Sequence, residues 1–504
     1  MKEWLSSGAA RAWFGVALTG LVVIVLVFAL MLIPRLGSGQ EVLDAAAPAF
    51  TDARVEGTRA GVFTLSQYVD VVDPLLTRRG GGAREVPQFF GYLQRKLGLT
   101  EEQVRKILRR EAPHTEALLR ALPLDGVAAE VPRVTGYLAT IMGLPEEELA
   151  AILERDFPRI SQTLTGLSNT SEAWYDVPGI DGLTRLRGDK PVRTVPGLRK
   201  YLRDDVVPLM VAQRENFQDA AGRGGIGYIP FMLLAFGAGL LAFGLFGVRR
   251  TRRIVPGKLS WSLVVAAGVL MIVIVVGGQY FPRLGGAQEA IESFEPVLSE
   301  NRVRGIANGV DTIHEAVSLG DPIMTAAGGA AAEAPRLYRL VAQRTGRRTD
   351  DVREALLRRA PRTSALLSAI PLTEVGREIP DLLAYLQKAL RLSRTGVVAA
   401  LRRRTPRLTQ ALLTTPDVAR GWSAIPGTAE LTRFDGITPV RTMPEFEGYL
   451  REDLVPVLVS ERENFATLSG GQPSIETLAP LMLITGAFVM FYGGMMMQFF
   501  SRRY

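Results

Sequence analysis

The sequence predicts an all-α membrane protein with four transmembrane helices, arranged as two tandem copies of a span–ectodomain–span unit. Residues 191–217 return without a gap at residues 439–465, at an offset of 248 and with 16 identical residues in 27. Each copy begins and ends with an apolar run that is long enough to cross a hydrocarbon core of about 30 Å as a helix. Between its two spans, each copy holds a lobe whose apolar spacing is mainly helical, and which we expect to be extracytoplasmic.

In chain order, the hydropathy and the repeat predict nine segments. They are a cytoplasmic N-terminus (1–14), a first span (15–34), a first lobe (35–226), a second span (228–248), a cytoplasmic loop (249–258), a third span (259–281), a second lobe (283–475), a fourth span (478–500) and a cytoplasmic C-terminus (501–504). The first run is longer than the h-region of a signal peptide, which is about 7–15 residues. Its counterpart lies in the middle of the chain, so both are interpreted as membrane anchors.

The orientation follows from the basic residues of the three short segments outside the lobes. These segments hold nine Lys and Arg residues, including Arg249, Arg250, Arg252 and Arg253, and one acid, Glu3. Such a bias places them on the cytoplasmic side, with both lobes outward, in the cytoplasmic membrane of a prokaryote. Trp4, Trp13 and Trp261 then fall at the inner membrane interface, where amphipathic rings are enriched.

The formal net charge of +8 does not indicate a nucleic-acid partner. The three short segments account for all of it, which leaves 50 basic and 50 acidic residues in the rest of the chain. The pI of 9.7 therefore reports membrane topology. The chain has no cysteine, so disulfide bonds are excluded and the lobes depend on their apolar cores.

A second repeat, of 45 residues, lies inside each lobe. The stretch from Tyr92 to Pro113 recurs from Tyr137 to Pro158, and all four copies in the chain end in Arg-x-x-Pro. Thr100 with Gln103 predicts a capping box, and a proline such as Pro113 suits the first turn of the next helix. Two interpretations of the Arg-x-x-Pro ends are open. The arginines could line an anionic groove, for instance for lipid headgroups, or each could neutralise the end of its own helix.

The segments near the membrane are less regular. After the first and third spans we expect helices over Gln40–Arg54 and Gln288–Arg302, with no strong breaker until Gly57 and Gly305 and a possible kink at each proline, 48 and 296. Residues 170–195 and 418–443 are rich in Gly, Pro and Asp and predict irregular loops or a short hairpin.

The candidate interaction residues are those that return in both copies. Trp174 and Trp422 are interpreted either as anchors for a partner or as plugs that fix a loop to the core. The two copies are most similar in the Val-Arg-Thr-x-Pro segments (192–196 and 440–444) and the Arg-Glu-Asn-Phe segments (214–217 and 462–465). The Arg-Glu-Asn-Phe segment is interpreted either as a docking or packing site between the lobes or as a helix terminus whose polar groups bind the loop arginine. Their candidate residues are Arg193, Arg441, Arg214, Glu215, Asn216, Phe217, Arg462, Glu463, Asn464 and Phe465.

No motif indicates an enzyme, and we expect no catalytic residue, cofactor or metal site. Gly222-x-Gly224-x-x-Gly227 matches a dinucleotide fingerprint only as a string, because it enters an apolar span instead of opening a βαβ unit. His114 and His314 are not 248 residues apart and belong to no cluster with metal-ligand spacing.

We therefore expect a non-enzymatic scaffold or accessory subunit of a bacterial cell-envelope complex, with the bilayer, envelope proteins or its own copies as partners. A component that binds or transfers a lipid beside a transporter is one alternative, and a sensor that needs a partner to signal is another. Whether the lobes pack on each other remains open at this stage.

Overall fold

The computed structural model describes residues 8–221, 225–250 and 258–503. Within these ranges the chain is all-helical, and its only β-type pairings are two isolated bridges, Thr184 with Pro191 and Thr432 with Pro439. Trp4, the glycines at 222 and 224, and most of the basic loop, including Arg252 and Arg253, fall outside the described residues.

The chain forms two compact units, and both copies of the sequence repeat contribute to each of them. One unit holds residues 1–55, 209–300 and 457–504, and the other holds residues 56–208 and 301–456. We call the first the membrane unit, because it contains the four apolar helices, and the second the helical head. The central parts of the two lobes, residues 56–208 and 301–456, therefore share one packed body.

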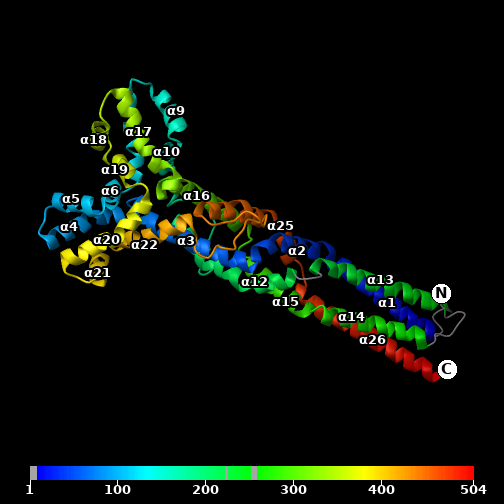
Figure 1. Cartoon of the computed structure of the whole chain (residues 1–504). Helices are drawn as coiled ribbons and strands as arrows, with labels where there is room; N and C mark the ends of the chain where they lie inside the picture. Colours follow the sequence, from blue (N-terminus) through cyan, green and yellow to red (C-terminus); the bar gives the residue numbers. More distant parts are fainter. Residues whose placement is uncertain (1–7, 222–224, 251–257, 504) are drawn as a thin grey trace. The chain divides into compact units, whose positions relative to one another are not determined.

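Four helices of the membrane unit are long and apolar enough to cross a membrane. They are α1 (Gly8–Ala29), α13 (Ile229–Arg250), α14 (Lys258–Gly277) and α26 (Leu478–Arg503). Helix α1 packs along α13 and α14 packs along α26, so the spans of each copy form a pair (Figure 1). Glycines permit this close packing. A Cβ atom on Gly20 would lie 2.4 Å from the carbonyl oxygen of Gly237, and one on Gly268 would lie 2.6 Å from that of Gly486.

Trp13 and Trp261, which are one repeat apart, stack on each other inside the membrane unit. Their ring centroids are 4.2 Å apart with an interplanar angle of 13°, and the side chains are 2% and 0% exposed. Phe243 and Phe500 complete the aromatic cluster. These tryptophans were predicted to fall at the inner membrane interface; in the structure their rings fill the contact between the two copies.

The first and third apolar helices end earlier than predicted, at equivalent positions. Met31 and Gln279 have φ values of 49° and 53°, a left-handed conformation that stops a helix. New helices follow at once, α2 (Leu32–Ala46) and α15 (Tyr280–Phe294).

The predicted helices Gln40–Arg54 and Gln288–Arg302 are divided near their prolines. A short η2 (Ala47–Phe50) separates α2 from α3 (Asp52–Leu76), and a turn separates α15 from α16 (Glu300–Met324). The prolines end the helices at these points, because proline has no backbone N–H to continue the hydrogen-bond ladder.

Gly57 and Gly305 were expected to break these helices, and that expectation is wrong, because both lie inside α3 and α16. Their role is close packing against the opposite copy. A Cβ atom on Gly57 would lie 2.8 Å from Leu431, and one on Gly305 would lie 3.0 Å from Leu183. Leu183 and Leu431 are themselves one repeat apart, so each long helix receives the loop of the other copy.

The helical head contains two arms, each built from both copies. The first arm combines α4 (Gly82–Leu97), α5 (Glu101–Glu111) and α6 (Pro113–Ala121) with α20 (Leu372–Leu390), α21 (Arg394–Arg404) and α22 (Pro406–Ser423). The second arm combines α8 (Val131–Met142), α9 (Glu146–Asp156) and α10 (Pro158–Ala173) with α17 (Ala330–Thr345), α18 (Thr349–Arg359) and α19 (Pro361–Ala369). Helix α6 packs against its equivalent α19 and joins the arms.

The helix starts predicted within the 45-residue repeat are confirmed. Thr100 and Gln103 form the capping box of α5, and Pro113 is the first residue of α6. A proline opens each of α6, α10, α19 and α22.

Each of these four proline-led helices is capped by a glutamate from the opposite copy. Carboxylate oxygens of Glu85 and Glu378 accept hydrogen bonds from the N–H groups of Leu408 and Thr115, both at 2.8 Å. Those of Glu130 and Glu333 accept from Thr363 and Ile160, both at 2.9 Å. A carboxylate at a helix N-terminus satisfies free N–H groups and favours the positive end of the helix dipole. The four bonds therefore fasten the two copies together.

The rest of the chain connects these parts. A short α7 (Asp125–Ala128) precedes α8. The first copy continues through α11 (Val195–Tyr201), η3 (Leu202–Val206) and α12 (Val207–Ala221). The second continues through α23 (Met443–Tyr449), η6 (Leu450–Leu454), α24 (Val455–Ser460) and α25 (Arg462–Ser469).

Candidate interaction surfaces

Trp174 and Trp422 lie in the interior of the head. They are 0% and 2% exposed, and their indole N–H groups donate to Asp73 and Asp321 at 3.0 Å each. The neighbouring Tyr175 also donates to Asp73, at 2.8 Å, and partial burial raises the pKa of its phenol to about 12. Of the two interpretations, this placement agrees with a plug that fixes the loop to the core.

The Val-Arg-Thr-x-Pro segments begin α11 and α23. Thr194 accepts a hydrogen bond from the N–H of Gly197 at 3.0 Å, and Thr442 forms a capping box with Glu445. The side chains of Arg193 and Arg441 are exposed, and the guanidinium of Arg441 donates to the carbonyl oxygen of Thr428. The similarity of these segments thus reflects a helix start whose arginine reaches the surface.

The Arg-Glu-Asn-Phe segments lie in the membrane unit, on α12 and α25. Arg214 pairs with Asp52 at 3.3 Å, and Arg462 pairs with Glu300 at 3.0 Å, which are equivalent contacts one repeat apart. Each arginine also lies near the glutamate that follows it, Glu215 at 3.7 Å and Glu463 at 3.8 Å. These glutamates remain exposed.

The Asn and Phe residues of these segments serve packing. Asn216 donates to Gln213 at 2.7 Å, one turn back on α12, and Asn464 donates to Glu461 at 2.9 Å. Phe217 stacks on Phe50, with centroids 4.0 Å apart, and meets the edge of Phe294 from the second copy. Phe465 is buried. Of the two interpretations, the Phe217 contacts agree with packing between the copies.

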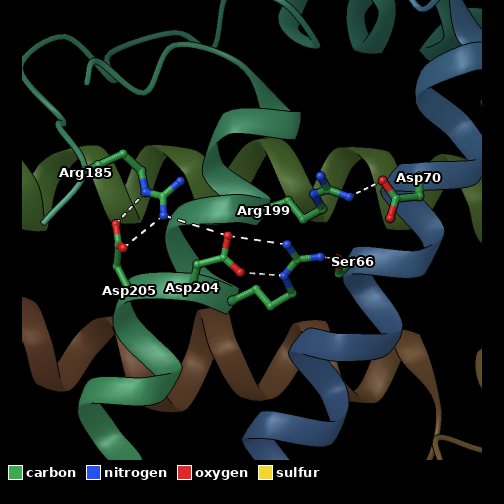
Figure 2. A network of polar contacts seen from close by, with 7 residues as sticks. Ser66, Asp70, Arg185, Arg199, Asp204 and Asp205 are labelled. Atoms are coloured by element: carbon green, nitrogen blue, oxygen red, sulfur yellow. Dashed lines mark hydrogen bonds and ion pairs between the residues drawn. The ribbon is translucent and has the colours of Figure 1, made fainter. Parts of the chain in front are cut away.

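A polar network in the head surrounds η3, a π-helical turn between α11 and α12 (Figure 2). Arg185, from the loop before α11, makes two hydrogen bonds to Asp205 at 2.6 and 3.0 Å. Arg203 donates to Asp204 at 2.7 Å and to Ser66 on α3 at 3.1 Å, and the bond to Arg203 lowers the pKa of the Asp204 carboxyl. Arg199 pairs with Asp70 on the same helix α3. The network ties the loop and α11 to α3.

The second copy keeps one half of this network and changes the other half. Arg433 binds Asp453 at 2.6 Å, as Arg185 binds Asp205, again beside a π-helical turn. At the position of Arg199 it carries Glu447, whose carboxylate lies 2.8 Å from Nδ1 of His314. The two copies therefore use charges of opposite sign at one buried position.

The two copies differ in charge much more strongly on two equivalent helices at the surface of the arms. Helix α9 carries five acids and one arginine, a net charge of −4, whereas its equivalent α21 carries four arginines and no acid, a net charge of +4. The related helices α5 and α18 have net charges of +1 and 0. Comparing the charges of the four copies of the short repeat would have found this contrast from sequence alone.

Apart from Arg155 and Asp156, which pair with each other, the charged side chains of α9 and α21 are exposed and make no ion pair in the described part of the chain. Glu146, Glu147, Glu148 and Glu154 are exposed and make no ion pair there. Arg394, Arg403 and Arg404 are likewise exposed and unpaired, and Arg402 makes one 3.4 Å hydrogen bond to Gln410. The arginines of the Arg-x-x-Pro ends are also exposed, and Arg110 and Arg155 pair with the acid that follows each of them.

One cavity in the interior of the head is small. An apolar cavity in the second arm, between helices of both copies, has a volume of about 20 Å³. That is close to the space of one water molecule. Within residues 8–221, 225–250 and 258–503, no group of three or more His, Asp and Glu side chains is placed to hold a metal ion.

Comparison with known proteins returns no relative. No protein family, curated protein or solved structure matches the chain.

Proposed function

We propose that this protein is a non-enzymatic membrane scaffold of the bacterial cell envelope, which presents its helical head outside the cytoplasmic membrane to bind protein partners. The observation that carries the proposal is the pair of oppositely charged, exposed helices α9 and α21 on the two arms of the head. Unpaired charges on two arms suit docking, because complementary charge patches steer association and select partners.

The proposed topology places both chain ends and the 249–258 loop in the cytoplasm. It is supported by the basic residues of these segments and by the even number of spans in each copy. The two lobe segments then lie on the same side of the membrane, as one intertwined head requires. A protease added outside intact cells should leave the loop uncut, whereas cleavage between Arg249 and Lys258 overturns this topology.

Lipid binding is the second candidate function, and one feature of the membrane unit favours it. An apolar groove of about 280 Å³ runs between α13 and α14 and is open to its surroundings. Its walls include Phe236, Gly239 and Phe243 on one side and Leu263 and Ala267 on the other. Such a groove in a membrane-spanning region would hold the acyl chain of a bilayer lipid.

Native mass spectrometry of the detergent-purified chain separates the two functions. Protein subunits retained at a fixed stoichiometry support the scaffold. Lipid binding is favoured, and the scaffold function is overturned, if a lipid is retained while no protein subunit and no self-association is found. The retained lipid should then be lost when Gly239→Phe fills the groove. The matched control is Gly494→Phe in α26, a glycine whose added Cβ would also meet no atom within 4 Å and which does not line the groove.

A further inference from the structure

We propose that the partner of this head is a second copy of the same chain, and that α9 of one molecule packs antiparallel against α21 of another. The proposal rests on the scaffold function and names the occupant of its two charged surfaces. Helices α9 and α21 occupy equivalent places in the two copies of the repeat, yet their net charges are −4 and +4. Each helix is thus the electrostatic complement of its own counterpart.

The two helices cannot satisfy each other within one molecule. Helix α9 packs on α8 and α10 in the second arm, whereas α21 packs on α20, α22 and α4 in the first arm. Figure 1 draws them at the ends of different arms. Their unpaired charges are therefore available to another molecule.

The outer faces of both helices allow close approach. On α9 the exposed residues Glu147, Ala151 and Glu154 lie one and two turns apart, and on α21 the equivalent residues are Thr395, Ala399 and Arg402. An alanine at the centre of each face permits two helix axes to approach to about 8–10 Å. The contact therefore has a small apolar centre, flanked by Glu147 and Glu154 on α9 and by Thr395 and Arg402 on α21.

The order of the charges selects the antiparallel arrangement. With Ala151 against Ala399, an antiparallel pair places the exposed glutamates 146–148 opposite the arginines 402–404. At the other end, Arg394 faces the turn that holds Glu154, Arg155 and Asp156. A parallel pair would place the glutamates near Arg394 alone and leave the three consecutive arginines opposite Glu154, Arg155 and Asp156. The antiparallel pair also opposes the two helix dipoles, which is favourable.

The contact joins two different surfaces, so it is heterologous. If both arms of two molecules engage each other, the contact closes into a dimer. Otherwise a pair joined by one contact leaves α21 of one molecule and α9 of the other free, and a chain grows. Either outcome gives an assembly that is sensitive to salt, because the exposed charges are screened at high ionic strength.

Cysteine cross-linking of the full-length chain tests the contact, because the protein has no cysteine of its own. Ala151→Cys and Ala399→Cys variants, carrying different tags, are reconstituted together in liposomes and treated with a short bismaleimide. We expect a cross-linked product in the mixture and none from either variant alone. Lys106→Cys replaces Ala151→Cys as a matched control, because Lys106 is the exposed equivalent of Ala151 on α5. A yield no higher than this control overturns the proposal.

Charge reversal tests the pairing of α9 with α21, and mixing the two variants shows whether they are still folded. The triple variants Glu146→Arg/Glu147→Arg/Glu148→Arg and Arg402→Glu/Arg403→Glu/Arg404→Glu should each self-associate at least about tenfold more weakly than the unmodified chain. Mixing the two variants should restore association, which unfolded variants cannot do.

The competing explanation is that α21 binds anionic headgroups of the bilayer. Two results together would overturn the proposal in favour of lipid. The full chain would bind phosphatidylglycerol vesicles and lose that binding on arginine reversal, and the Ala151→Cys and Ala399→Cys variants would give no cross-link. Protein subunits still retained at fixed stoichiometry would leave the scaffold function standing, so the two failures are distinguishable.

Discussion

The hydroxyl of Tyr68 donates a 2.8 Å hydrogen bond to the carbonyl oxygen of Ala316, the residue that lies 248 positions later. Residues one repeat apart touch only where the two copies face each other around a local twofold axis. In the membrane unit, Trp13 and Trp261 meet in the same way. Each unit, taken by itself, is therefore assembled like a homodimer whose two halves belong to one chain.

Separating the two copies should show directly that each copy needs the other in order to fold. When the chain is divided within the 251–257 loop, we expect residues 1–253 and 254–504 to assemble into a soluble complex in detergent only if they are produced together. Each half alone lacks the glutamates that cap its proline-led helices, so it should aggregate or form a homodimer. Size-exclusion chromatography with light scattering measures the outcome, and a stable monomeric half would contradict the intertwined head.

Removal of a capping glutamate should destabilise the head. Glu130 is 8% exposed and accepts hydrogen bonds from the N–H groups of Arg362 and Thr363 at 3.0 and 2.9 Å. Glu130→Ala leaves these donors, of which Thr363 is buried, without their partner, and we expect a loss of about 1–2 kcal/mol in unfolding free energy. Glu147→Ala, on the exposed face of α9, is the control and should change stability by less than about 0.5 kcal/mol. Equal effects of the two variants in denaturant titrations would refute the capping role.

Local structure was predictable from the sequence because its causes are local. The capping box of Thr100 and the prolines that open α6 and α10 act within one turn of a helix, so their residues alone indicate them. The glutamates at 85, 130, 333 and 378 are also regular, because each begins a Glu-x-Pro motif 28 residues before a proline-led helix. That motif lies just upstream of the stretch on which the short repeat is recognised.

The capping of each proline-led helix by a glutamate of the opposite copy was not predictable in this way. A glutamate can cap the equivalent helix of its own copy or of the other copy with the same hydrogen bonds, so the local sequence does not decide between them. The choice depends on how the long helices α3 and α16 carry the chain past the opposite loops. Gly57 and Gly305 contribute to that packing, although by propensity they are helix breakers.

Packing of the membrane helices should depend on the glycines at their contacts. A Cβ atom on Gly20 would lie 2.4 Å from backbone atoms of α13, so Gly20→Ala forces α1 and α13 apart. We expect a cost of about 1–3 kcal/mol, measured as reduced thermal stability in detergent. Gly239→Ala in α13 is the matched control, since a Cβ atom there meets nothing within 4 Å. If Gly20→Ala and the control melt at the same temperature, the helices do not pack as described.

Acid should weaken the turn at Asp435 in the second copy, through a carboxyl group that the equivalent turn of the first copy lacks. Asp435 accepts hydrogen bonds from the hydroxyl of Thr438 at 2.6 Å and from the N–H groups of Thr438 and Ile437 at 2.9 and 2.8 Å, and these bonds lower the pKa of its carboxyl to about 2. Because this pKa lies below the value of about 3.9 in an unfolded chain, the stabilisation is complete above pH 4 and is lost as the pH falls toward 2. The equivalent position in the first copy is Arg187, so that hairpin serves as an internal control. An NMR titration of ¹³C-labelled aspartate should give a low pKa for Asp435, and Thr438→Val should raise it. An ordinary pKa in the unmodified chain would show that these hydrogen bonds are absent.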